Sequence, residues 1–135
     1  MELKKGDAAP VNSNIFTTIY GDPGLGKTSF AITAEEPLLL DFDQRGHRAY
    51  GAERCSRIDV KCFNDIAEAA NKYRGKFKSL IVDTIGRSLD LKTLEIIAAS
   101  KETPSVKAHN AFGGLSLQGY GILKSAFYNA CQEIR

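Results

Sequence analysis

Apolar positions along the chain occur in short runs that predict strands, and between these runs they recur at helical spacing. The predicted strands cover residues 15–20, 38–42, 57–60 and 79–83, because each run is β-branched or apolar and is bounded by turn-forming or charged residues. The predicted helices cover 27–34, a segment from Asn64 or Asp65 to Gly75, 88–100, and the stretch from Gln118 to the last residue. Strands that alternate with helices favour right-handed crossovers and a mostly parallel sheet. The pattern therefore predicts an α/β fold.

The domain organisation follows from the same pattern. Residues 1–13 are polar, contain Gly6 and Pro10, and predict a flexible lead-in. Residues 14–135 have the length of one ordinary domain. The sequence ends inside a predicted helix with no closing strand after it. Because a doubly wound sheet usually continues beyond such a helix, we expect the domain to be C-terminally truncated and incomplete.

Composition and charge narrow the class of protein. Hydrophobic residues make up 43% and charged residues 25% of the chain, which is typical of a soluble globular protein and argues against a disordered or fibrous one. No apolar stretch approaches the ~20 residues of a membrane helix. Eighteen Lys and Arg against sixteen Asp and Glu leave a net charge of +2, too small to indicate a nucleic-acid partner by itself. Three cysteines without a C-x-x-C pair indicate a reduced, cytosolic protein.

One segment carries a specific chemical signal. Residues 21–28 read GDPGLGKT and match the P-loop pattern G-x-x-x-x-G-K-[ST] between a predicted strand and a predicted helix. Glycines let successive backbone N–H groups turn inward around phosphate oxygens, and the following helix points its positive end at them. Lys27 supplies a cation for the β- and γ-phosphates, and the Thr28 hydroxyl can ligate Mg²⁺. The predicted nucleotide-binding residues are Gly21, Asp22, Pro23, Gly24, Leu25, Gly26, Lys27, Thr28 and Ser29.

Acidic residues follow two of the predicted strands. Asp83 ends the apolar strand 79–83, the Walker B arrangement, in which the carboxylate holds Mg²⁺ directly or through water. Asp43 lies just past the strand 38–42, where ligands gather in open α/β sheets. It is the candidate that positions the attacking water, and Asp41, two residues earlier, competes for this role. We therefore predict Thr28 and Asp83 as metal ligands and Asp43 and Lys27 as catalytic residues.

With these features in this order, the chain resembles the RecA-like family of P-loop ATPases. More narrowly, it resembles phage-encoded nucleotide-binding proteins of that class, which include RecA-like single-strand annealing proteins. Residues 19–28, 40–43 with 46–48, 81–84 and 117–121 carry the resemblance. It implies a RecA-like P-loop core with helices flanking a mostly parallel sheet, and slow ATP hydrolysis with Mg²⁺. In that family the acid at the place of Asp43 is usually Glu, which is longer.

The resemblance also implies partners and a DNA-contacting loop. Expected partners are single-stranded DNA, further copies of the chain as a homo-oligomer, and a single-strand DNA-binding protein, with no membrane. The expected location is the cytoplasm, that of the host cell if a phage encodes the protein. The family's first DNA loop corresponds to residues 103–117, and its second would fall after Arg135. The candidate DNA contacts are Lys107, His109, Asn110, Phe112, Gly113 and Gly114.

Three alternatives stay open. A GTPase is suggested by D-x-x-G at residues 83–86, although the guanine-selecting N-K-x-D is missing from the sequence. A nucleoside monophosphate kinase also begins with G-x-P-G-x-G-K, but it needs several arginines around the acceptor phosphate and a lid. A DNA-binding module that retains nucleotide without hydrolysing it is the alternative from outside the enzymes.

Overall fold

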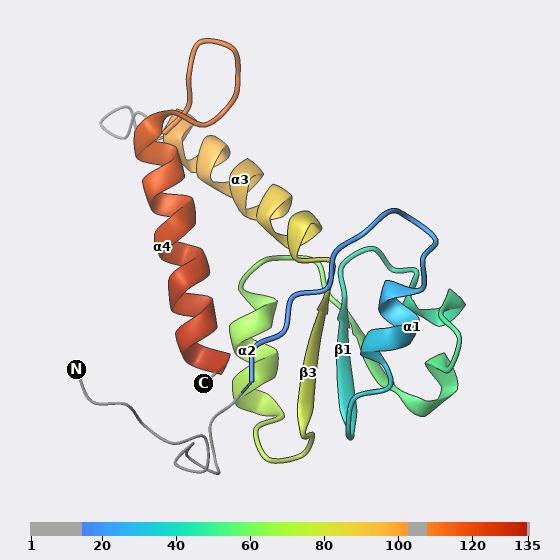
Figure 1. Cartoon of the computed structure of the whole chain (residues 1–135). Coiled ribbons are helices and arrows are strands. Elements are labelled where there is room, and N and C mark those ends of the chain that lie inside the picture. Colours follow the sequence, from blue (N-terminus) through green and yellow to red (C-terminus); the bar gives the residue numbers. More distant parts are fainter. Residues whose placement is uncertain (1–14, 103–107, 135) are drawn as a thin grey trace, which may run out of the picture.

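The computed structural model describes residues 15–102 and 108–134. Its sheet is parallel and has the strand order β2-β1-β3, with β1 at Pro37–Asp41, β2 at Ser56–Asp59 and β3 at Ser79–Asp83. The α-helices are α1 (Lys27–Ala31), α2 (Asp65–Lys72), α3 (Ile85–Glu102) and α4 (Leu117–Ile134), and the 3-10 helices are η2 (Gly46–Arg48) and η3 (Ala52–Arg54). The predicted α/β fold with a parallel sheet flanked by helices is confirmed (Figure 1).

The central strand β1 is covered on both faces, and all five of its residues are buried. Alternate side chains of a strand point to opposite faces. Leu38 and Leu40 therefore join a core cluster with Ile66 of α2 and Ala130 of α4, while Leu39 points to the other face. Figure 1 shows α2 and α4 on one side of the strands and α1 on the other. This two-sided cover explains why β1 reads as a continuous apolar run.

The strand predicted at residues 15–20 is wrong. The segment has no regular structure and pairs with no strand among the described residues. Ile15 and Tyr20 are 88% and 91% exposed. A β-branched and aromatic run has the side chains of a strand, but strand formation depends on a neighbouring strand and on burial. Neither is supplied here, because the described sheet ends at β3.

The two long helices form a hairpin beyond the sheet. α3 begins at Ile85, three residues before its predicted start, because the Thr84 side chain accepts a hydrogen bond from the Arg87 N–H at 3.3 Å and caps the first turn. α4 packs against both α2 and α3 (Figure 1). Tyr120 and Phe127 belong to the apolar spacing from which α4 was predicted, yet both are exposed, as are Leu117 and Tyr128.

A second, smaller cluster joins α3, α4 and the loop between them. Its buried members are Ile96, Ala108 and Leu115. Gly119 of α4 packs so tightly here that a Cβ would collide with the carbonyl oxygen of Ala108. Residues 1–13, the predicted lead-in, and Lys107 lie outside the described residues. Among the residues that are described, no helix is both long and apolar enough to cross a membrane.

Candidate nucleotide-binding site

The predicted P-loop is an exposed turn that leads into α1. Gly24 and Gly26 have φ values of 82° and 76°, a left-handed conformation that a side chain with a Cβ would strain. α1 ends at Ala31 rather than at the predicted residue 34. A helix of five residues has a small macrodipole, since the dipole sums over aligned peptide units. Backbone N–H groups and Lys27 must therefore provide most of the attraction for phosphate.

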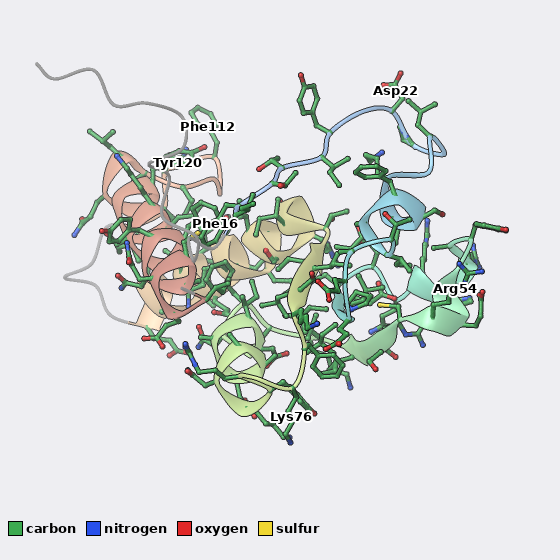
Figure 2. All side chains as sticks on the ribbon, turned by 60° about the horizontal axis from the view of Figure 1, so that its bottom comes forward. Phe16, Asp22, Arg54, Lys76, Phe112 and Tyr120 are labelled. Atoms are coloured by element: carbon green, nitrogen blue, oxygen red, sulfur yellow. The ribbon has the colours of Figure 1, made fainter. Side chains whose placement is uncertain are left out.

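The Lys27 ammonium group lies over its own loop. Its Nζ donates hydrogen bonds to the carbonyl oxygens of Gly21 at 2.8 Å and Asp22 at 2.7 Å. The Asp22 side chain extends from the outer bend of the loop (Figure 2). The lysine cation is thereby held against the start of the glycine-rich turn, where an anion bound by this turn would meet it.

The two predicted metal ligands meet across the fold. The Thr28 hydroxyl, in the first turn of α1, donates a hydrogen bond to Asp83 Oδ2 at 2.7 Å, although 55 residues separate the two in sequence. Asp83 ends β3, and parallel strands bring their carboxyl ends to one edge of the sheet. A hydroxyl and a carboxylate oxygen at this distance fit Mg²⁺, which prefers hard oxygen ligands. The residues present therefore suit a Mg²⁺-bound nucleotide.

Asp43 lies beside the residue that follows Asp83. Thr84 Oγ1 donates to Asp43 Oδ2 at 3.5 Å, a long contact, and Phe42 N–H donates to the Asp83 carbonyl at 2.7 Å. These bonds link the end of β1 to the end of β3. Asp43 is exposed, so its carboxylate is open to water and to a ligand at this edge.

Asp41, the competing candidate, has a different environment. Its side chain is fully buried. The carboxylate accepts hydrogen bonds from the backbone N–H groups of Arg45 at 3.2 Å and Gly46 at 2.6 Å, and Arg57 Nη1 lies 3.8 Å away. A carboxylate enclosed in this way cannot reach an attacking water. Of the two candidates, only Asp43 is accessible.

The comparison with protein families agrees with this geometry. The model of a family described as an AAA domain matches residues 13–135. The chain belongs to the AAA domain family. It is therefore a P-loop nucleotide-binding domain, and residues 21–28 remain the predicted phosphate-binding loop within it. A search of curated proteins and a search of solved structures found no match.

In the AAA domain, a residue that the sequence did not single out contacts α1 just after the P-loop. Tyr50 N–H donates to Ser29 Oγ at 3.0 Å, and the Tyr50 side chain is 86% exposed. Aromatic rings offer a face on which nucleotide bases stack. The signal in the sequence was a lone aromatic residue in the polar segment 43–54, but only the fold shows that this segment packs on α1.

The predicted DNA loop of the AAA domain is ordered by its own hydrogen bonds where it is described. Asn110 Oδ1 accepts from the N–H groups of Phe112 at 3.0 Å and Gly114 at 2.9 Å, and Asn110 Nδ2 donates to the Leu115 carbonyl at 3.3 Å. Gly113 has a left-handed φ of 82°. The loop thereby presents Phe112, 97% exposed, at its tip (Figure 2).

His109 lies at the base of this loop. It forms an antiparallel bridge with Leu115, and its Nδ1 is 2.7 Å from the Ser100 hydroxyl at the end of α3. The contacts of Asn110 and His109 therefore hold the loop in its shape. Of the predicted contact residues that the structure describes, Phe112 has the side chain most open to a partner.

Proposed function

We propose that this AAA domain is a RecA-like, Mg²⁺-dependent ATPase that binds single-stranded DNA in phage recombination or strand annealing. The observation that carries the ATPase part is the 2.7 Å hydrogen bond between Thr28 and Asp83. Two oxygen ligands that are remote in sequence meet beside the P-loop, and both are of the kind that Mg²⁺ prefers. Bound Mg²⁺ supplies charge neutralisation to the β- and γ-phosphates.

The chain's own residues divide the work as follows. Lys27 exchanges the carbonyl oxygens of Gly21 and Asp22 for phosphate oxygens, and backbone N–H groups of the loop donate to the same phosphates. Asp43 orients the attacking water and accepts its proton while the bond from the γ-phosphorus to the bridging oxygen breaks and ADP leaves. Because Asp is shorter than Glu, we expect slow turnover unless a neighbouring subunit of a homo-oligomer adds an arginine.

A pair of substitutions at Thr28 tests the ATPase proposal. Thr28→Ser keeps the hydroxyl, whereas Thr28→Val keeps the shape and removes it. We expect Thr28→Ser to hydrolyse ATP near the parent rate at saturating Mg²⁺ and Thr28→Val to lose turnover by about 10²-fold, the usual scale for one electrostatic group of an active site. Equal rates for the two variants would contradict a metal-binding role for the hydroxyl.

The support for DNA is the loop that exposes Phe112 between His109 and Leu115. An exposed aromatic ring can stack on a base of single-stranded DNA. ATP hydrolysis measured with and without single-stranded DNA tests this part of the proposal. Stimulation by DNA supports the recombination role, whereas stimulation by a nucleoside monophosphate would favour the kinase alternative. ATP binding without turnover, with DNA affinity unchanged by Lys27→Ala, would favour the non-hydrolysing module.

A further inference from the structure

The strongest unexplained feature of the chain is the charged group buried at the end of β1. Asp41 is fully buried, and a buried carboxylate is costly unless its oxygens are satisfied. Here each oxygen has a backbone partner: Oδ1 accepts from Arg45 N–H at 3.2 Å and Oδ2 from Gly46 N–H at 2.6 Å. Arg57 supplies a positive charge at 3.8 Å. The side chain of Asp41 therefore closes a turn in its own backbone.

The turn that Asp41 closes contains Asp43. On one side of it, Phe42 is fixed by its buried ring and by its hydrogen bond to the Asp83 carbonyl at 2.7 Å. On the other side, the hydrogen bonds that Arg45 N–H and Gly46 N–H donate to Asp41 fix the backbone of these two residues. Only Asp43 and Gln44 lie between these anchors, and Gln44 takes a left-handed φ of 55° to complete the turn. The backbone of Asp43 thus depends directly on the buried carboxylate.

The packing around Asp41 leaves its carboxylate little room to move. A Cβ on Gly46 would lie 2.8 Å from Asp41 Oδ2 and 2.6 Å from Leu39 Cδ2. Gly46 itself is buried. The glycine backbone is therefore in close contact with the carboxylate that binds its N–H, so the oxygens are confined by packing as well as by hydrogen bonds.

We propose that Asp41 is a positioning residue, which fixes the backbone turn that directs Asp43 toward Thr84 at the nucleotide site. The proposal rests on the proposed ATPase function and adds a role to it: the buried acid acts only through the exposed one. A residue that acts through another has no effect of its own on turnover once that other residue is removed.

A double-mutant cycle tests this prediction. Asp41→Asn removes one acceptor and the charge, and we expect it to lower ATP turnover by about 10²-fold, the scale on which small misplacements act, with unchanged ATP affinity. In the Asp43→Asn background the same substitution should cause no further loss. Additive losses in the cycle, or parent turnover in folded Asp41→Asn, would overturn the proposal.

Asp59→Asn is the matched control. Asp59, like Asp41, forms an ion pair with Arg57, at 3.3 Å. Unlike Asp41, the Asp59 side chain is half-exposed, and within the described part of the chain it makes no hydrogen bond to the turn. It should keep the parent turnover. If Asp41→Asn fails to fold, Gly46→Ala takes its place, because it presses on the same carboxylate without removing its charge. Folded Gly46→Ala with parent turnover would then contradict the proposal.

A second readout separates this proposal from the ATPase proposal. Amide hydrogen exchange of Arg45 and Gly46, whose N–H groups donate to the Asp41 carboxylate, reports the turn directly and needs no nucleotide. We expect Asp41→Asn to lose protection at these amides, while Asp59→Asn keeps it. If the parent neither binds nor hydrolyses ATP, the proposed function fails, and lost protection would still uphold the positioning of Asp43. Unchanged protection would overturn it whatever the turnover.

Discussion

Gly46→Ala is the substitution whose cost can be worked most directly from the structure. The φ of Gly46 lies outside the left-handed region, so alanine brings no backbone strain and the change isolates packing. Its Cβ would lie 2.6 Å from Leu39 Cδ2 and 2.8 Å from Asp41 Oδ2. Both neighbours are buried, so neither can turn out to solvent to relieve the overlap.

The magnitude follows from two opposed terms. Overpacking of a well-packed core costs about 1–3 kcal/mol. Replacing glycine by alanine at a compatible backbone position returns about 0.4–1 kcal/mol, because the unfolded chain becomes stiffer. With the middle of each range, the net loss in the free energy of unfolding is about 1.3 kcal/mol, and the limits are roughly 0 and 2.6 kcal/mol. For a chain of this size, with about 4 °C per kcal/mol, we expect the midpoint of thermal unfolding to fall by several degrees.

Gly121→Ala is the matched control for this measurement. Gly121 lies in α4, and a Cβ there would meet nothing within 4 Å. Alanine should raise the unfolding midpoint, since glycine costs a helix interior about 1 kcal/mol relative to alanine. Thermal and urea unfolding followed by circular dichroism measure both variants. Equal midpoints for Gly46→Ala and the parent would refute the packing argument around Asp41.

Three further predictions concern the pH dependence of stability, the binding of the nucleotide base and the binding of single-stranded DNA. Burial acts to raise the pKa of Asp65, but hydrogen bonds from the Cys62 thiol and from the backbone N–H groups of Cys62 and Lys61 outweigh it and lower that pKa. A lowered folded-state pKa adds stability above the ordinary value of about 3.9, and this stability is lost as pH falls through the folded value. In urea unfolding from pH 6 down to about pH 3, the free energy of unfolding should therefore fall less for Asp65→Asn than for the parent. The same dependence on pH in both proteins would count against these bonds. Tyr50→Ala should weaken ATP binding about tenfold, as loss of one stacking contact does, and Tyr50→Phe should not; equal affinities in a fluorescent-nucleotide titration would exclude a stacking role. Phe112→Ala should weaken binding of single-stranded DNA but leave the salt dependence of that binding unchanged, because stacking involves no phosphate neutralisation; parent affinity in fluorescence anisotropy would remove Phe112 from the interface.

The parts of the fold that could be predicted from the sequence are those that a short stretch of residues determines by itself. The apolar runs that became β1, β2 and β3 had the right period and ended at turn residues, and the P-loop motif could be located from its spacing alone. Asp83 could be expected near Thr28 because the P-loop and the Walker B strand both contribute ligands to Mg²⁺, and their 2.7 Å hydrogen bond agrees with this expectation.

What the sequence could not predict depended on contacts between distant segments. Residues 15–20 look like a strand, yet nothing in their own composition says whether a neighbouring strand will pair with them. Asp41 and Asp43 differ by two positions and share a strand end, so only burial distinguishes them. The contact of Tyr50 with Ser29 likewise appears only when the segment after β1 folds back on α1.

Calorimetric titration of the chain with ATP in the presence of Mg²⁺ tests the central claim most directly. The variants for comparison are Lys27→Ala, which removes the cation held over the loop, and Lys72→Ala, which removes an exposed cation from α2. We predict saturable heat for the parent and for Lys72→Ala, and no measurable binding for Lys27→Ala. The absence of binding by the folded parent, or the same affinity in all three proteins, would contradict the assignment of this loop as a phosphate-binding site.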